Sequence, residues 1–240
     1  MLALKTLDIE PNTQAMATVL ANGLAQGSVN ALFCIATRKS YQARETVVWE
    51  GDVGRNLFEV VSGVVKLYKL TPDGRRQVTG FVYPGQMLGL VHRDRHIYTA
   101  EAVTDTVLCL YPRAKLEQLA DQTPELVRSL LNLANNDLIA AQEQMLLLGR
   151  KSATEKIATF LLNLSDDNRR REEAAERLFL PMTRTDIGDY LGLTTETVSR
   201  VMNRLKDVGL IALRQHKYVH LLDLDRLREL AEGDCCAIEY

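Results

Sequence analysis

The sequence predicts an α+β chain with three successive parts: an N-terminal antiparallel β-roll, a long helix, and a C-terminal domain of short helices with a β-hairpin. Three observations support this prediction. Glycines separate short runs rich in Val, Leu, Tyr and Thr between residues 41 and 111, a pattern typical of short antiparallel strands. Residues 125–148 contain neither proline nor glycine, as a long helix requires. Residues 183–223 contain two helix-capping sequences around a glycine, followed by two runs of alternating polarity.

Composition and charge limit the class of protein. The chain has 240 residues, of which 46% are hydrophobic and 25% are charged, which is enough for one large domain or two ordinary domains with hydrophobic cores. The net charge is only -2, so any basic surface for nucleic acid must be local. No apolar run approaches the length of about 18 residues that a membrane span needs, and the acidic N-terminus differs from a signal peptide. We therefore expect a cytoplasmic protein with no membrane partner.

The first part of the chain is predicted to be a lead-in over residues 1–40 and the β-roll over residues 41–120. The lead-in has little pattern apart from a helical stretch around Ala31 to Arg38. The Pro-Asp-Gly at 72–74 is expected to form a hairpin turn within the roll. Cupin-like rolls sometimes hold a metal, but a metal site needs His and carboxylate side chains on facing strands. The four histidines do not have such a spacing, so we expect neither a metal site nor an enzyme.

The helix expected over residues 124–149 carries an apolar stripe with heptad spacing. The members of the stripe alternate steps of four and three residues, which gives an a/d seam of about three heptads. The stripe could instead pack on the helix's own domain, but it is narrower than such a face usually is, and its alanines let two helices approach closely. We therefore predict a dimerisation helix. The seam residues are Val127, Leu131, Ala134, Leu138, Ala141, Met145 and Leu148.

The C-terminal domain is expected over residues 152–232 and is followed by a tail at 233–240. Ser-Ala-Thr-Glu at 152–155 matches a capping box and begins the first helix of this domain. The segment 166–177 has nearly equal numbers of acidic and basic residues. We interpret it as a solvated surface connection.

Two short helices follow, joined at a glycine. Thr183 and Asp186 form a second capping sequence, Gly192 ends that helix, and Thr194 caps the next helix. Two alternating strands come next and meet around residues 215–217. A capped helix, a tight turn, a second capped helix and a hairpin, in this order, predict a winged helix-turn-helix domain. The inward face of its second helix is expected to consist of Val198, Val201, Met202 and Leu205.

The opposite face of this second helix has side chains that are suited to contacting the bases of DNA. Arg200 can donate two hydrogen bonds to O6 and N7 of guanine, Glu196 can accept one from the N4 amine of cytosine, and Ser199 can approach several base edges. Residues 181–220 contain six Lys or Arg against four Asp or Glu. An ordinary solvated face is the alternative, but the order of caps, turn and hairpin favours base recognition. Candidates for contacts to DNA phosphates, which fix register, are Thr183, Arg184, Thr194, Thr195, Asn203 and Lys217.

These features together resemble the CRP/FNR family of bacterial transcription regulators. The resemblance covers about residues 40–230, and its most specific part is Glu-Thr-Val-Ser-Arg at 196–200. It implies a roll similar to a cyclic-nucleotide-binding domain, a homodimer on palindromic double-stranded DNA, and activation of transcription through contact with RNA polymerase. Glu196, Ser199 and Arg200 are similar to the FNR and FixK branches, and this similarity implies a TTGAT-N4-ATCAA-like inverted repeat.

The resemblance also makes predictions about cofactors. The cyclic-nucleotide branch has a glutamate for the ribose and an arginine for the phosphate where this chain has Leu90 and Tyr98, and neither side chain can replace them. The FNR branch binds an iron-sulfur cluster through three N-terminal cysteines and one cysteine in the roll. Cys109 matches the roll cysteine, but the N-terminal three are absent and Cys34 lies too close to the roll to replace them. We therefore predict a FixK-like regulator of low-oxygen or nitrogen-fixation genes that uses neither cAMP nor a cluster.

The sequence leaves some alternatives open. Haem bound by His92 and His96, or a small effector, would make DNA binding effector-dependent, although an exposed polar loop also accounts for both histidines. Arg93 or Arg95 could replace the missing phosphate-binding arginine. Candidates for redox chemistry are Cys109, which is expected in the core, and Cys235 and Cys236 in the tail. The candidates for polymerase contact are the loops at 71–76 and 84–86.

Overall fold

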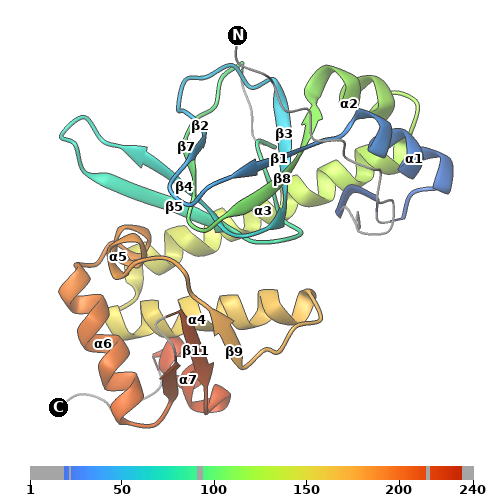
Figure 1. The fold of residues 1–240 in the computed structure, drawn as a ribbon. Helices are drawn as coiled ribbons and strands as arrows, with labels where there is room; N and C mark the ends of the chain where they lie inside the picture. The colour runs from blue at the N-terminus through green and yellow to red at the C-terminus, as the bar shows by residue number, and fades with distance from the viewer. Residues whose placement is uncertain (1–18, 22, 91–93, 215–216, 234–240) are drawn as a thin grey trace.

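The computed structural model describes residues 19–21, 23–90, 94–214 and 217–233 of the chain. Figure 1 shows the β-roll above, the C-terminal domain below, and a long helix that runs along the lower side of the roll. This helix is α3 (Pro124–Arg150), which corresponds to the helix predicted at 124–149. None of the described helices combines the length and apolar character that crossing a bilayer requires.

Two four-stranded antiparallel sheets form the roll. The first has the strand order β1-β8-β3-β6, with β1 (Thr37–Tyr41), β3 (Asn56–Ser62), β6 (Met87–Leu88) and β8 (Thr106–Pro112). The second has the order β2-β7-β4-β5, with β2 (Thr46–Val48), β4 (Val65–Leu70), β5 (Arg76–Val82) and β7 (Thr99–Ala102). Alternate residues of both sheets bury apolar side chains between them. These buried side chains include Phe58, Val60, Val65, Val82, Ala100 and Leu108.

The predicted turn at 72–74 is confirmed as the hairpin between β4 and β5. The Gly74 N–H donates to the Thr71 carbonyl at 2.8 Å, and the Thr71 N–H donates to the Arg75 carbonyl at 2.8 Å. Gly74 has φ +81°, a left-handed conformation that glycine adopts without steric cost. The local sequence was therefore sufficient to place this turn.

The predicted helical stretch from Ala31 to Arg38 is wrong at both ends. The helix is α1 (Gln26–Ile35), and residues 37–41 instead form strand β1. Each residue of β1 faces a residue of β8, from Thr37 opposite Leu110 to Tyr41 opposite Thr106. This ladder satisfies the backbone groups of the segment, and it involves a strand about 70 residues away that local propensity cannot reveal.

A layer of helices covers the sheet that contains β1, β8, β3 and β6. It consists of a 3-10 turn η2 (Val19–Ala21), α1, α2 (Arg113–Ala120) and the first turns of α3. Its core contains Leu20, Leu32, Leu116 and Leu126, packed with side chains from the sheet such as Cys109 and Tyr111. The described residues from Val19 to Ile35 therefore pack against the roll.

The C-terminal domain contains four helices and one sheet within its described residues. The helices are α4 (Ala153–Arg170), α5 (Arg184–Leu191), α6 (Thr195–Asp207) and α7 (Leu224–Glu232). The antiparallel sheet has the order β10-β11-β9, with β9 (Arg177–Phe179), β10 (Ile211–Arg214) and β11 (Tyr218–Leu221). β10 and β11 form the predicted hairpin, which we call the wing. The predicted capping box at 152–155 is confirmed, because Ser152 and Glu155 bond reciprocally at the start of α4.

The segment 166–177 is mostly exposed, as its charge pattern suggested, but part of it is helical and Asn168 within it is buried. Helix α4 continues through it to Arg170, and β9 begins at Arg177. The Asn168 side chain is buried and donates to the carbonyls of Ala174 and Arg177, each at 3.0 Å. Because this amide satisfies two backbone carbonyls, it stabilises the turn that leads into the sheet.

Candidate nucleic-acid interface

Helices α5 and α6 form a helix-turn-helix whose turn is fixed by local chemistry. Gly192, with φ +65°, ends α5 in the left-handed conformation. A Cβ atom on Gly188 would lie 2.6 Å from the Leu193 carbonyl oxygen, so a side chain does not fit at that position. The Thr194 hydroxyl then accepts a hydrogen bond from the Thr197 N–H at 3.2 Å and caps α6. The two caps and the glycine turn predicted from the sequence are all present.

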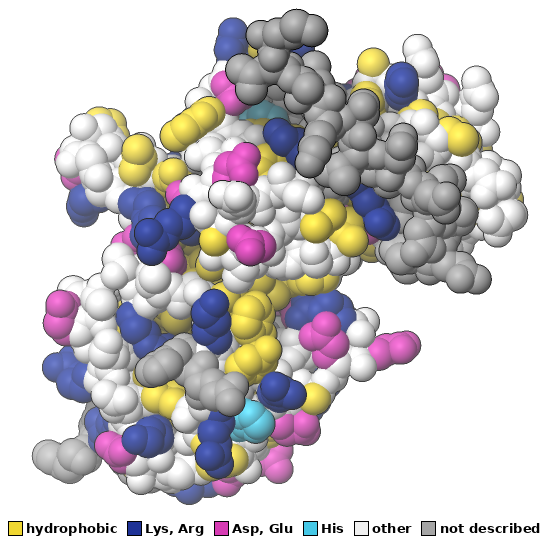
Figure 2. Space-filling model, in the orientation of Figure 1, with side chains coloured by type: hydrophobic (Ala, Val, Ile, Leu, Met, Phe, Trp, Pro, Cys, Tyr) yellow, Lys and Arg dark blue, Asp and Glu magenta, His cyan; other side chains and the backbone are white. Residues whose placement is uncertain are grey.

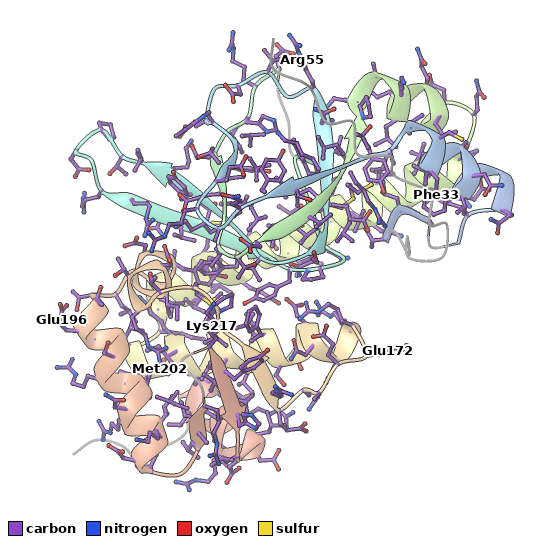
Figure 3. The ribbon with its side chains drawn as sticks, viewed as in Figure 1. Phe33, Arg55, Glu172, Glu196, Met202 and Lys217 are labelled. Atoms are coloured by element: carbon purple, nitrogen blue, oxygen red, sulfur yellow. The ribbon has the colours of Figure 1, made fainter. Side chains whose placement is uncertain are left out.

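Helix α6 has one buried face and one polar face, as the sequence predicted. Val198, Val201, Met202 and Leu205 are buried. The opposite side, which we call the recognition face, consists of Glu196, Ser199, Arg200 and Asn203. Figure 3 shows Glu196 on the outer side of α6 and Met202 on the inner side. Glu196, Arg200 and Asn203 are exposed and Ser199 is partly exposed, so bases of a DNA groove could reach these four side chains.

Three of the candidate phosphate contacts are threonines whose hydroxyls already have partners in the protein. The Thr183 hydroxyl donates to Asp186 Oδ2 at 2.7 Å and accepts from the Asp186 N–H at 3.0 Å. The Thr194 hydroxyl caps α6, and the Thr195 hydroxyl lies 3.2 Å from that of Thr185. These threonines shape the helix starts, and only lone pairs or rotated hydroxyls are left for a phosphate.

The other phosphate candidates have freer side chains. Asn203 and Lys217 are exposed, and Lys217 lies immediately before β11, where the chain passes from β10 to β11 in the wing. Arg184 is partly buried, and burial lowers the pKa of its guanidinium. Figure 2 shows many Lys and Arg side chains on the visible face of the C-terminal domain, in agreement with the local excess of positive charge in residues 181–220.

The predicted seam on α3 is an uncovered apolar face of the single chain. Leu126 and Leu147 are buried in the chain's own cores. The seam side chains are exposed, by 59% for Leu131, 57% for Leu138 and 65% for Met145. Ala134 and Ala141 lie between them and are also exposed. A contiguous apolar stripe that water contacts in one chain marks a surface that another protein surface is expected to cover.

The interior of the roll is closed by its own side chains near Tyr98. The Tyr98 hydroxyl accepts a hydrogen bond from the buried Gly89 N–H at 2.7 Å. Arg113 donates to the Gly89 carbonyl at 2.6 Å and to the Gly54 carbonyl at 3.2 Å. His96 is only 7% exposed, and its ring lies 6.2 Å from Phe58 and 6.3 Å from Tyr98. The interpretation of His96 as part of an exposed polar loop is therefore wrong, because its imidazole packs among aromatic rings.

Comparison with known proteins identifies the family. Residues 38–123 match the model of the cyclic nucleotide-binding domain, and residues 155–230 match that of the Crp-like helix-turn-helix domain. The nitrogen fixation regulation protein FixK of Bradyrhizobium diazoefficiens is 41% identical over 197 residues, which cover 82% of this chain and 83% of that protein. The chain belongs to the CRP/FNR family. The predicted resemblance is thus confirmed, and so is the α+β fold with a roll and a C-terminal helix-turn-helix.

Other members of the CRP/FNR family support the same assignment. The transcriptional activator protein FnrL of Cereibacter sphaeroides is 40% identical and covers 82% of this chain and 81% of its own length. The structure of FixK2 from Bradyrhizobium japonicum, at 40% identity, superposes with a TM-score of 0.76 and covers 82% of this chain and 97% of that chain. Because these relatives are transcription regulators, the prediction that the chain is not an enzyme is confirmed.

The roll of this CRP/FNR member does not fit a cyclic nucleotide bound as in the cyclic-nucleotide branch. The Gly89 N–H is already bonded to the Tyr98 hydroxyl. Tyr98 has no positive charge, and burial raises its pKa to about 12, so it stays neutral at physiological pH. Arg95, a possible substitute for the phosphate-binding arginine, donates to the Gly51 carbonyl at 2.7 Å. Arg93 and His92 lie outside the described residues.

The cysteines of this CRP/FNR member do not assemble into a cluster within the part of the chain that the structure describes. Cys109 is 1% exposed and packs in the apolar layer between the sheet and the N-terminal helices. Burial raises the pKa of its thiol, which keeps it protonated and unreactive. Cys34 is exposed, and no group of three potential metal ligands occurs among the described residues. Cys235 and Cys236 lie outside them.

Sequence reasoning missed the contacts between the roll and the helix-turn-helix. Arg76 and Gln86 belong to the two loops that the sequence suggested for contact with RNA polymerase. In the structure Arg76 instead pairs with Asp186 of α5, and the Gln86 amide donates to Asp167 of α4 at 3.2 Å. The Tyr83 hydroxyl donates to the Phe179 carbonyl at 3.3 Å. These partners are about 80 to 110 residues apart in sequence, so no local pattern could indicate them.

Replacing Tyr98 by phenylalanine is expected to lower the free energy of unfolding by about 1 to 3 kcal/mol, because the buried Gly89 N–H would lose its acceptor. Urea denaturation of the variant and the wild type measures this difference. Tyr218→Phe is the matched control, since its hydroxyl has no hydrogen bond within the described part of the chain. An equal and small effect of both substitutions would show that the Tyr98 hydroxyl does not stabilise the roll.

Proposed function

We propose that this protein is a homodimeric transcription activator that binds a TTGAT-N4-ATCAA-like inverted repeat and needs neither a cyclic nucleotide nor an iron-sulfur cluster to do so. The observation that carries the proposal is the largely exposed recognition face of α6, on a helix whose opposite face is buried in the core. The relatives include FixK proteins named for nitrogen fixation regulation and the activator FnrL. Genes of low-oxygen respiration or nitrogen fixation are therefore the proposed targets.

The chemistry of the recognition face accounts for the proposed sequence. In TTGAT, Arg200 would contact the guanine through O6 and N7, and Glu196 would accept from the N4 amine of the cytosine paired with it. Ser199, one residue before Arg200, would contact a neighbouring base edge. Lys217, Arg184 and Asn203 would contact phosphates and fix the register. The threonines at the helix starts support this geometry through their caps.

The proposed homodimer follows from the seam on α3. Two copies of α3 packed along this stripe would bury the exposed leucines and Met145, and the alanines between them would allow close approach. A two-fold axis through the seam would place the two α6 helices on successive major grooves, about 34 Å apart. An inverted repeat is the DNA sequence that matches such a symmetric pair.

The proposed division of the chain is a lead-in at 1–40, the roll at 41–120, a dimerisation helix at 124–149, a DNA-binding domain at 152–232 and a tail at 233–240. The proposal places the protein in the cytoplasm with DNA and RNA polymerase as partners.

The alternative is a sensor of the same family whose DNA binding requires haem or another small effector. The internal bond between Tyr98 and Gly89 favours effector independence, because the buried Gly89 N–H is already satisfied by the protein and is not free to bind a ligand.

The test is binding of purified protein, free of metal and nucleotide, to a duplex with the TTGAT-N4-ATCAA repeat and to a scrambled duplex at the same salt concentration. We expect selective binding, by about a thousandfold or more, which is typical of specific protein–DNA complexes. Selectivity that emerges only after addition of haem or a nucleotide would instead support the effector-gated alternative. Absence of selectivity under all these conditions would contradict the proposed operator.

A further inference from the structure

A cluster of charged side chains joins the roll to the first helix of the helix-turn-helix. Lys66 of β4 lies 3.2 Å from Asp186 of α5, and its ammonium group also lies 3.0 Å from Glu101 of β7. Arg76 of β5 lies 2.7 Å from Asp186 and 2.7 Å from Asp189. We call the group formed by Lys66, Arg76, Asp186 and Asp189 the domain clasp. Figure 1 shows α5 directly beneath the strands that carry the two basic residues.

Burial makes the geometry of the domain clasp specific. The side chains of Lys66 and Asp186 are only 9% and 6% exposed. A shift of α5 that left the Asp186 carboxylate buried without Lys66 and Arg76 would be strongly unfavourable, which restricts the positions that α5 can take against the roll. Burial alone would raise the pKa of the Asp186 carboxyl, but hydrogen bonds from Thr183 and the charge of Lys66 outweigh it and hold the pKa below its usual value. The carboxylate is therefore ionised at neutral pH.

Further contacts hold α5 from several sides. Gln77 of β5 donates to the Asp189 carbonyl at 2.6 Å, and Gln144 of α3 donates to the Tyr190 carbonyl at 2.9 Å. The Tyr190 ring lies 5.4 Å from that of Phe81 in the roll and 5.7 Å from that of Phe160 in α4. The roll, the seam helix and α4 thus all contact the last turns of α5, while the domain clasp fixes its first turn through the capping residue Asp186.

Fixing α5 also fixes the recognition face. The turn between α5 and α6 is too tight for a side chain at Gly188, and the two helices pack directly on one another. The orientation of α5 relative to the roll therefore determines the direction in which α6 points. Glu196, Arg200 and Asn203 are exposed while the domain clasp is closed, so the clasp does not mask the surface that would contact DNA.

We propose that Lys66 and Arg76 are positioning residues for DNA recognition. Through Asp186 and Asp189 they hold α6 of each protomer at the angle at which both recognition faces of the homodimer match two half-sites separated by four base pairs. This inference rests on the proposed function. It assigns to the roll a direct mechanical role in half-site spacing, performed by its own side chains rather than by a bound ligand.

The test compares Arg76→Gln, Asp189→Asn and the double variant with the wild type. These two side chains are 27% and 25% exposed, so their substitution disturbs the core less than changes at Lys66 or Asp186. Binding is measured to the repeat with a four-base-pair spacer, to repeats with five or six base pairs, and to a single half-site. Each added base pair turns one half-site by about 35° relative to the other. Thermal unfolding verifies that each variant is folded.

We expect each variant to bind the four-base-pair operator about tenfold more weakly. A less well positioned α6 lowers the effective concentration of the second recognition face at its half-site. Binding to the single half-site should not change, and the preference for the four-base-pair spacer should decrease. The double variant should be no weaker than Arg76→Gln, because Arg76→Gln already removes the pair with Asp189 as well as the pair with Asp186. Arg75→Gln is the matched control, because Arg75 is 82% exposed and pairs with Asp73 within its own hairpin.

Three results would overturn the inference. An unchanged spacer preference in the folded variants would show that the domain clasp does not position α6. An equal loss on the half-site and on the full operator would show a general loss of affinity rather than a loss of positioning. Failure of the wild type to select the operator over a scrambled duplex would overturn the proposed function and this inference with it, so the two failures are distinguished by the wild-type measurement.

Discussion

Arg200→Ala is expected to abolish discrimination of the guanine in each half-site while the fold and the dimer remain intact. Arg200 is exposed on α6, and its neighbours Val201 and Met202 provide the buried contacts of that turn. A bidentate arginine–guanine contact discriminates by about 1 to 3 kcal/mol, which corresponds to a roughly 5- to 150-fold change in Kd for each half-site. Alanine also preserves the helix, because both residues have high helix propensity.

The measurement is the ratio of Kd values for the operator and for a duplex in which the guanines are replaced by adenines. Wild-type protein should show a large ratio, and Arg200→Ala a ratio near one. Lys217→Ala removes an equal charge near the wing and is the matched control. It should weaken binding to both duplexes similarly and reduce the slope of log K against log salt by about one per protomer. A ratio that persists in Arg200→Ala would refute the assignment of Arg200 to guanine.

The helix-turn-helix could be predicted from the sequence because its determinants are local. The caps at Thr183 and Thr194 bond to groups three residues away, and Gly192 ends α5 by its own conformation. The alternation of buried and exposed positions in α6 follows from a period of 3.6 residues. The same holds for the turn at Gly74. Each of these features depends on a few neighbouring residues, so sequence patterns were sufficient.

Features that depend on distant parts of the chain were not predicted. Asn168 is buried because it bonds to Ala174 and Arg177 where α4 turns back toward the sheet, although its neighbours in sequence are mostly charged. Arg76 follows an exposed turn and resembles a loop residue, but it pairs with α5. In both cases tertiary contacts, and not the local pattern, determine the environment of the side chain.

Tyr98 has a structural role that the sequence did not indicate. The sequence indicated only that a tyrosine occupies the place of a phosphate-binding arginine. In the structure the Tyr98 hydroxyl accepts a hydrogen bond from the Gly89 N–H, and the Tyr98 ring packs near His96 inside the roll. The buried Gly89 N–H therefore has its acceptor within the protein itself.

Leu138→Glu is expected to dissociate the homodimer and thereby abolish tight operator binding. Leu138 is 57% exposed on α3 and lies in the middle of the seam. In the symmetric dimer the substitution removes two buried leucines, each contributing about 1.5 to 3 kcal/mol. It also places two carboxylates close to each other in an apolar interface, where unpaired charges are strongly unfavourable. The dimer Kd should therefore rise by more than about a hundredfold.

Sedimentation equilibrium and operator binding measure this effect together. Asn136→Glu is the matched control, because it adds the same charge at an exposed position of α3 that lies outside the seam. The control should remain dimeric and bind the operator as the wild type does, whereas Leu138→Glu should sediment as a folded monomer. A single half-site should still bind this monomer weakly, because the recognition face belongs to each chain separately. A Leu138→Glu protein that stays dimeric would show that the two chains associate through a surface other than the seam.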